Sequence, residues 1–426
     1  MSANYEEILE HARGLEIIDT HEHLPAREEL RNRETDVLKE YLNQYFNSDV
    51  RSAGLPDGDY RKVIDHTLPL MERWRLVEPY WEKARHTGYC RALDITARDL
   101  YGIERISGET IECLNEAFLR TLEPGHFRWV LKEKSRIKTS LLDVGAGDCD
   151  RTLFLPIYRF DHFIYPRWSE DVRLVESEAG FRVTAFDDWL QAIEAAFERL
   201  PGQGFVALKH GLAYERPLYY ERVSKKEAEE GFNAIFKVKH FPEWVPGAFT
   251  IGKACQDYVM HFILRQANRR GYTYQMHTGI QEGSGNIISN SDPALLSNLF
   301  VEYPDVDFDL FHIGYPYEHT LSALAKMFPN VFIDMCWAHI ISPTASVNAL
   351  VEWLDAVPAN KISAFGGDYG FVDAVYGHQY LARQNVSKAL AIKVADGVFD
   401  VERAKRIAEM LFLRNPVAIF KLEGRL

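Results

Sequence analysis

The feature that most constrains the fold is a regular alternation of strand-like and helix-like segments. Near the end of the chain, apolar strand-like runs at 307–312, 331–337 and 362–368 are separated by segments with helical spacing. Earlier strand-like runs fall at residues 15–20, 137–144, 153–160, 205–209 and 272–277. Strands that alternate with helices form a parallel sheet, and about eight repeats indicate an α/β fold, a closed (β/α)8 TIM barrel.

The first two predicted strands are far apart in the sequence. Between them, residues 25–135 are rich in charged and aromatic side chains, and their apolar residues recur at helical spacing. We therefore expect a large, mainly helical insertion after strand one, within a single barrel domain that spans residues 1–426. The strand at 153–160 is the weakest prediction, because Pro156 cannot donate a ladder hydrogen bond.

Composition narrows the class of ligand. The formal net charge is −13, which argues against nucleic acid and anionic membranes, since both are bound through basic surface. No apolar run is long enough to span a bilayer and no cleavable leader is recognisable, so we expect a cytoplasmic protein. The expected partner is a small-molecule substrate, and a homo-oligomer is left open.

The cysteines do not predict a disulfide framework. There are five, an odd number, and none is paired in C-x-x-C spacing, which is typical of reduced thiols. Cys336 lies within the apolar run Val331–Trp337, so we expect it to pack in the core and not to act as a nucleophile.

Two histidines close the first predicted strand. In a strand, residues i and i+2 point to the same side, so His21 and His23 project together. Two imidazoles at the carboxyl end of a barrel strand make half of a zinc-type ligand set. The pair alone is equally compatible with two solvated histidines, and only ligands on later strands can decide between these readings.

Later strands end in matching groups. Strand four ends in Lys209, strand five in His277, strand six in His312 and strand eight in Asp368. Each residue alone is an ordinary polar group at a strand end. Because all these ends meet on one face of a barrel, their coincidence predicts a metal centre.

The chain resembles the amidohydrolase superfamily of metal-dependent barrel hydrolases. The resemblance runs from Asp19-Thr20-His21-Glu22-His23 to the closing segment Arg414–Phe420. The segments Leu208-Lys209-His210 and Gly366–Gly370 look most like the amidohydrolase-2 branch, and uronate isomerases are more distant relatives.

The resemblance implies roles for the strand-end residues. His21, His23 and His277 would be ligands of a divalent metal, most simply zinc, and Asp368 would be both ligand and general base. His312 would bind a second ion or the substrate. Lys209 would be carbamylated and bridge two ions, or would hold a substrate carboxylate, so either one or two ions are expected.

The function implied is hydrolysis of an amide or ester of a small, carboxylate-bearing molecule by metal-activated water. The alternatives on the same scaffold are a uronate-type isomerase, favoured by the helical insertion, and a non-oxidative decarboxylase. A non-catalytic scaffold is disfavoured because the ligand set is intact. Four residues on loops after predicted strands are candidates for substrate binding, an arginine being suited to a carboxylate: Arg159, Arg216, Tyr315 and His378.

Overall fold

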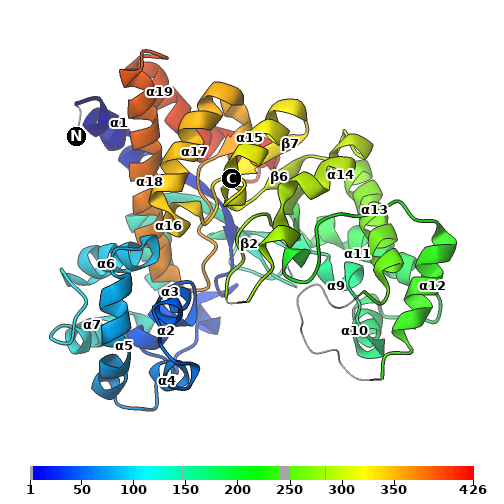
Figure 1. The fold of residues 1–426 in the computed structure, drawn as a ribbon, viewed down its shortest axis with the longest axis horizontal. Helices are drawn as coiled ribbons and strands as arrows, with labels where there is room; N and C mark the ends of the chain where they lie inside the picture. The colour runs from blue at the N-terminus through cyan, green and yellow to red at the C-terminus, as the bar shows by residue number, and fades with distance from the viewer. Residues whose placement is uncertain (1–2, 146, 240–249, 284) are drawn as a thin grey trace.

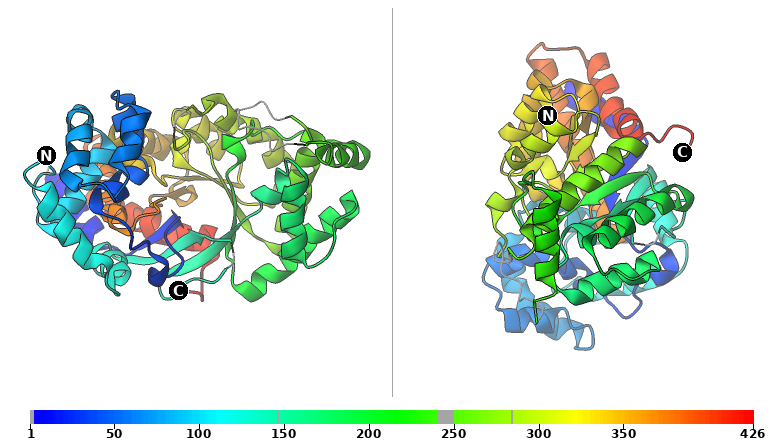
Figure 2. Two further views of the ribbon diagram at one scale, coloured as in Figure 1. Left: turned by 90° about the horizontal axis from the view of Figure 1, so that it is seen from below. Right: turned by 90° about the vertical axis from the view of Figure 1, so that its right-hand side faces the viewer.

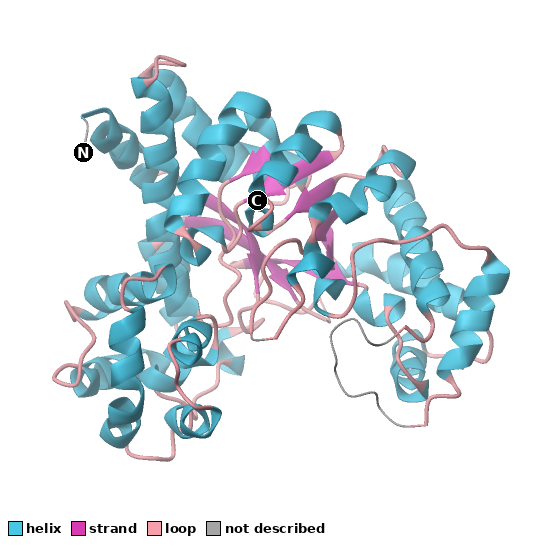
Figure 3. Ribbon diagram, viewed as in Figure 1, coloured by secondary structure: helices cyan, strands magenta, loops and turns pink. Residues whose placement is uncertain are grey.

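The computed structural model describes residues 3–145, 147–239, 250–283 and 285–426 as an α/β barrel. Its eight strands are parallel and lie side by side in chain order, so the predicted fold class is confirmed. Figure 3 shows the strands at the centre of the molecule with helices around them. The strands are β1 (Ile17–Glu22), β2 (Ile137–Asp143), β3 (Phe154–Arg159), β4 (Ala207–His210), β5 (Thr273–Met276), β6 (Phe308–Leu310), β7 (Val331–Asp334) and β8 (Ile362–Ser363).

The barrel is closed by hydrogen bonds between β1 and the segment that follows β8. The Thr20 amide donates to the Phe365 carbonyl at 3.0 Å, and the Asp368 amide donates to the His21 carbonyl at 2.8 Å. The His23 amide then donates to the Tyr369 carbonyl at 3.1 Å. This closure sets Asp368 beside the two histidines of β1, although they lie at opposite ends of the sequence.

The amino-terminal end of the barrel is filled with apolar side chains. Ile18, Leu141 and Ile157 from three strands pack there against Ile419 and Phe420 of the C-terminal segment. All six residues of β1 and all four residues of β4 and β5 are buried, as expected of strands covered on both faces. The carboxyl end of the barrel, by contrast, opens into a cavity of about 410 Å³.

Helices outside the insertion cover the barrel, and the long α18 runs along one side of it (Figures 1 and 2). These helices are α1 (Ala3–Gly14), α9 (Asp161–Ile164), α10 (Ser169–Ala179), α11 (Phe186–Gln203), α12 (Lys225–Ile235), α13 (Lys253–Arg270), α14 (Ser297–Glu302), α15 (Glu318–Met327), α16 (Ala338–Ile341), α17 (Pro343–Ala356), α18 (Val372–Ala395), α19 (Val401–Glu409) and α20 (Asn415–Ile419). Among the described residues, no helix has the length and apolar character that crossing a membrane requires.

The insertion between β1 and β2 is a compact group of helices on one side of the barrel mouth (Figure 1). It packs closely on α18: a Cβ atom added at Gly377 would lie 2.0 Å from the Ala92 carbonyl oxygen, so only glycine permits this approach. Its helices are α2 (Val37–Asn43), α3 (Phe46–Ser52), α4 (Asp57–Val63), α5 (Leu70–Ala84), α6 (Gly88–Tyr101), α7 (Ile111–Leu119) and α8 (His126–Arg128), with a π-helical turn at Trp129–Lys134.

Candidate functional site

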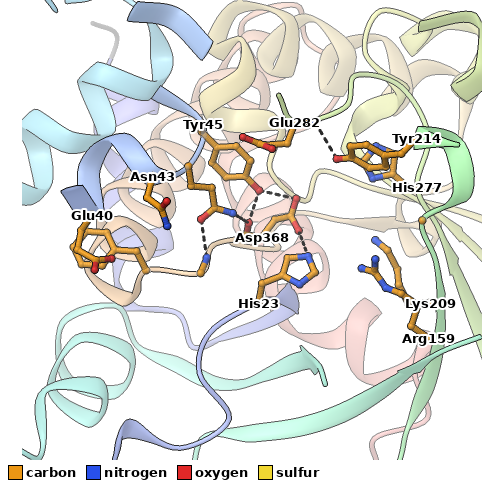
Figure 4. A pocket seen from close by; sticks show the side chains of 14 residues that line it. His23, Glu40, Asn43, Tyr45, Arg159, Lys209, Tyr214, His277, Glu282 and Asp368 are labelled. Carbon is orange, nitrogen blue, oxygen red and sulfur yellow. Dashed lines mark hydrogen bonds and ion pairs between the residues drawn. The ribbon is translucent and has the colours of Figure 1, made fainter. Parts of the chain in front are cut away.

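The six residues predicted as metal ligands meet at the open end of the barrel. They come from five strand ends: His21 and His23 from β1, Lys209 from β4, His277 after β5, His312 after β6 and Asp368 after β8. A cavity of about 410 Å³ opens above them, and four of the six line it: His23, Lys209, His277 and Asp368 (Figure 4). His21 and His312 are fully buried.

Three of these side chains, His21, His23 and Asp368, can hold one divalent ion. The Nε2 atoms of His21 and His23 are 3.3 Å apart. Asp368 Oδ1 lies 3.7 Å from the first and 3.2 Å from the second. Ligands about 2.0–2.1 Å from a tetrahedral zinc stand about 3.3 Å from each other, so the spacing fits such an ion. We name these three side chains the ligand triad.

Gln275 determines which ring nitrogen of His21 can bind a metal ion. Its amide NH2 donates to the Thr20 carbonyl at 2.8 Å, so its Oε1 must be the atom 3.1 Å from His21 Nδ1. That oxygen can only accept, which places the imidazole proton on Nδ1 and leaves Nε2 bare. Burial, then the charge of Lys209, holds the pKa of His21 well below its usual value, so the ring is neutral.

Replacing Gln275 by Leu is expected to weaken zinc binding by about 10- to 100-fold, because the His21 ring loses the acceptor that orients it. Competition with a chromophoric chelator would measure the affinity. Gln266→Leu is a matched control, since Gln266 is equally buried but bonds to Glu194 and Arg270, away from the site. Equal affinities for the two variants would contradict the role assigned to Gln275.

A second pair of nitrogens converges beside the triad. His277 Nε2 donates to the Ile280 carbonyl at 3.0 Å, and His312 Nδ1 donates to the Cys336 carbonyl at 3.0 Å. The remaining nitrogens, His277 Nδ1 and His312 Nε2, are therefore bare, yet they face each other at 3.1 Å. Burial lowers the pKa of His312 to about 4, which disfavours a proton between the rings. Two lone pairs at this separation fit a second cation.

Lys209 lies close enough to both sets of nitrogens for its charge to lower the pKa of His21, His277 and His312. It is 2% exposed, and its Nζ stands 3.7 Å from the centre of the Phe311 ring. Burial lowers the pKa of this lysine, and the nearby carboxylate of Asp368 opposes the shift. The same amine can hold a carboxylate when charged, or form a carbamate when neutral.

Asp368 is held in a strained conformation. Its φ of 60° lies in the left-handed region, and His312, Trp337 and Tyr45 near it also have positive φ. Such strain gathers at functional sites because the surroundings must enforce it. The Tyr45 hydroxyl lies within donating distance of both the Asp368 carbonyl and Asp368 Oδ2, the latter at 2.9 Å, and Gln44 donates to the Asp368 carbonyl at 3.2 Å. The junction of α2 and α3 thus fixes the carboxylate.

One predicted substrate-binding residue, Arg159, lines the cavity. It is the last residue of β3, and its Nε donates at 2.9 Å to Asp143, the last residue of β2. Asp143 Oδ2 in turn lies 3.9 Å from His21 Nε2. The guanidinium is thereby held at the rim of the metal centre.

The comparisons with known proteins agree with this geometry. A family model described as amidohydrolase matches residues 176–422, more than half of the chain. The chain belongs to the amidohydrolase family. The match includes β4 to β8, and so covers Lys209, His277, His312 and Asp368.

Relatives of this amidohydrolase include two curated proteins matched over short stretches. It is 29% identical to protein fluG of Emericella nidulans over 149 residues, which is 35% of this chain and 17% of that protein. It is 28% identical to a uronate isomerase of Caldanaerobacter subterraneus subsp. tengcongensis over 108 residues, 25% of this chain and 21% of that protein. The aligned stretches thus span about a fifth of each curated relative.

The fold of the amidohydrolase is shared over its whole length with a solved structure. The uronate isomerase from Thermotoga maritima superposes with a TM-score of 0.79 at 16% identity, covering 99% of this chain and 98% of the other. At this identity the likeness concerns the fold alone.

Three residues predicted to bind substrate do not line the cavity of this amidohydrolase. Arg216 is 5% exposed, and its guanidinium donates to Gln256, Asp257 and the Tyr219 carbonyl. Tyr315, half-buried, accepts the Ile280 amide proton on its carbonyl oxygen. His378 lies in α18 behind the β8 loop. None of these three residues is among those that line the cavity of about 410 Å³, and their contacts with a substrate stay predictions.

His378 has a structural role that its sequence position did not indicate. Its Nδ1 donates to the Gly367 carbonyl at 3.1 Å, one residue before Asp368. The ring is fully buried, so it braces the turn that carries the carboxylate.

Sequence reasoning missed several site residues. Gln275 could have been found, since it precedes His277 by two positions on β5 and must share its side of the strand. Asp143 could have been found as well, because it is a possible metal ligand at the carboxyl end of β2, like the residues predicted at the other strand ends. Tyr45 and Glu282 gave no local signal, because one is brought over the mouth by the insertion and the other by the loop after β5.

Proposed function

We propose that this amidohydrolase is a metal-dependent enzyme that interconverts the aldose and ketose forms of a small sugar acid. The polarity of the pocket around the ligand triad carries the proposal. Arg159 and Lys209 lie on one side, whereas Glu40 and Asn43 lie on the other and Glu282 lies above (Figure 4). A carboxylate fits the first side, and hydroxyl groups fit the hydrogen-bonding groups opposite.

The proposed reaction needs a base and an acid close together. Aldose–ketose interconversion moves one proton between neighbouring carbons and one between their oxygens, without uptake of water. A bound divalent ion would supply Lewis acidity to a substrate oxygen. Asp368 is the base that can take and return the carbon-bound proton, while Tyr45, bonded to its Oδ2, can exchange the oxygen-bound one.

Tyr45 is suited to the acid role. Burial, then the charge of Asp368, raises the pKa of Tyr45 well above its usual value, so the phenol keeps its proton at neutral pH. Its ring is stacked on Trp337 with centroids 4.5 Å apart, which fixes the hydroxyl over the carboxylate.

Replacing Tyr45 by Phe is expected to lower kcat by about 10²-fold, because the exchangeable proton is lost while the stacked ring remains. Initial rates and melting temperatures of the purified variant would be compared with the parent. Tyr89→Phe is the matched control: Tyr89 stacks on Tyr45 at 5.6 Å, and no hydrogen bond from it to Asp368 is found among the described residues. A similar loss in both variants would assign the effect to packing.

A second candidate is the hydrolysis of an amide or ester of a carboxylate-bearing molecule. The facing nitrogens of His277 and His312 favour it, because together with Lys209 they fit a second ion beside the first. In that reaction Asp368 would accept a proton from the attacking water. The carboxylate-binding side of the pocket serves this substrate class too, whereas Glu40 and Asn43 on the opposite side favour the hydroxyl groups of a sugar acid.

The experiment that tests the proposal is a substrate screen of the metal-loaded protein in heavy water. Uronic acids would be followed by nuclear magnetic resonance, alongside N-acyl amino acids and esters of small acids. The expected result is ketose formation with one deuterium on carbon. Cleavage of an amide or ester, release of carbon dioxide, or inert uronic acids would overturn it in favour of hydrolysis, decarboxylation or another substrate.

A further inference from the structure

A sulfur atom lies beside the ligand set at the end of β7. Cys336 is a free cysteine, it follows β7 by two residues, and it is fully buried. Its Sγ, a ring nitrogen of His312 and a carboxylate oxygen of Asp368 all lie within 4.8 Å of one another. Strands β6, β7 and β8 thus bring three different donor atoms to one point.

The facing imidazoles are the second observation at this point. His277 Nδ1 and His312 Nε2 are both bare and stand 3.1 Å apart, with Asp368 Oδ2 at 4.0 Å from the latter. Each tautomer is fixed by a backbone carbonyl, so neither ring can turn its proton inward without losing a hydrogen bond. A cation between the rings removes this repulsion, and the Cys336 sulfur lies within 4.8 Å of a ring nitrogen of His312.

The local backbone makes room for the sulfur. A Cβ atom added at Gly366 would lie 2.6 Å from Cys336 Sγ and 2.6 Å from Thr20 Oγ1, so glycine is required for this approach. The Cys336 carbonyl meanwhile accepts the His312 Nδ1 proton. Cys336 therefore orients the His312 imidazole through its carbonyl and places a sulfur atom within 4.8 Å of that ring.

We propose that Cys336 is a sulfur ligand of the cation held by His277 and His312, next to Asp368. On binding, a sulfur–metal bond forms and the thiol proton is released to solvent. A mixed nitrogen, sulfur and oxygen set selects zinc, cobalt or cadmium over magnesium and manganese. The inference rests on metal binding in the proposed function, and it holds for either candidate reaction.

Cobalt titration of the metal-free protein, residues 1–426, tests the ligand directly. Thiolate coordination to Co²⁺ gives a charge-transfer band in the near ultraviolet, which nitrogen and oxygen ligands alone do not give. We expect the band in the parent protein and in Cys255→Ser, a control cysteine that is fully buried in α13. We expect Cys336→Ser to lack the band and to bind the second cobalt at least about tenfold more weakly.

Two cobalt results would overturn the inference: a band that persists in Cys336→Ser, or a parent protein that binds cobalt without the band. The cadmium-113 chemical shift of the parent protein tests the same ligand without a variant. A chemical shift typical of nitrogen and oxygen ligands alone would also overturn the inference. Both readouts are spectroscopic, so inactivity toward uronic acids would refute the proposed reaction and leave the sulfur ligand standing.

Discussion

Asp368→Asn is expected to lower turnover by about 10³-fold while the barrel stays folded, because an amide cannot act as the base. The substitution is conservative for the backbone: asparagine tolerates the left-handed conformation that residue 368 adopts at φ 60°. Its oxygen can still face His21 and His23, and its NH2 group can meet the Tyr45 hydroxyl. The loss should therefore appear in kcat and not in the melting temperature.

Asp334→Asn is the control for this experiment. Asp334 is a fully buried aspartate at the end of the neighbouring β7, and burial raises its pKa to about 7. At a pKa of about 7 the carboxyl is about half protonated at neutral pH, so an amide resembles its neutral form, and turnover should stay within about threefold of the parent. Metal content must be measured for both variants. Turnover of Asp368→Asn within tenfold of the parent, at equal metal content, would remove Asp368 as the base.

The barrel could be predicted from the sequence because its signals are local. Each strand is a short apolar run bounded by helical spacing, and the alternation of the two periods fixes the topology without knowledge of contacts. Even the doubtful strand at 153–160 forms, as β3, since the Pro156 carbonyl accepts the Val206 amide proton at 3.0 Å. Proline has no amide proton, so it is tolerated at a strand position that does not have to donate a hydrogen bond.

The positions of the strand-end residues could be predicted for the same reason. Parallel strands all end at one face, so His21, Lys209, His277 and Asp368 had to approach one another. Their distances could not be predicted, because these depend on loop conformations such as the left-handed turn at Asp368. The direction of a side chain after a strand could not be predicted either. Arg216 follows β4, but its guanidinium forms an ion pair with the buried Asp257 on α13.

The insertion was predicted as helical, but its contribution to the site was not. Tyr45 and Gln44 reach Asp368 across more than 300 positions of sequence, and no periodicity encodes such a contact. The insertion does more than cover the mouth of the barrel, since it completes the hydrogen bonds that hold the strained aspartate.

Lys209→Met is expected to lower kcat/KM by about 10²-fold or more. The number of metal ions bound by the variant distinguishes the two roles of Lys209. Methionine has a similar length and packs well against an aromatic ring, so it can replace the lysine stem over Phe311. If Lys209 holds the substrate carboxylate as an ammonium group, the loss falls mainly on KM, and the metal content stays that of the parent.

A carbamylated Lys209 gives the opposite pattern. The modified side chain would be a ligand shared by two ions, so Lys209→Met would lose metal as well as activity, and a short carboxylic acid added at high concentration should restore part of both. The free-lysine reading supports the sugar-acid isomerase, in which Lys209 and Arg159 hold the carboxylate together. Lys209→Met with unchanged metal content and unchanged KM would exclude both roles, because a lysine buried beside the triad must then serve packing alone.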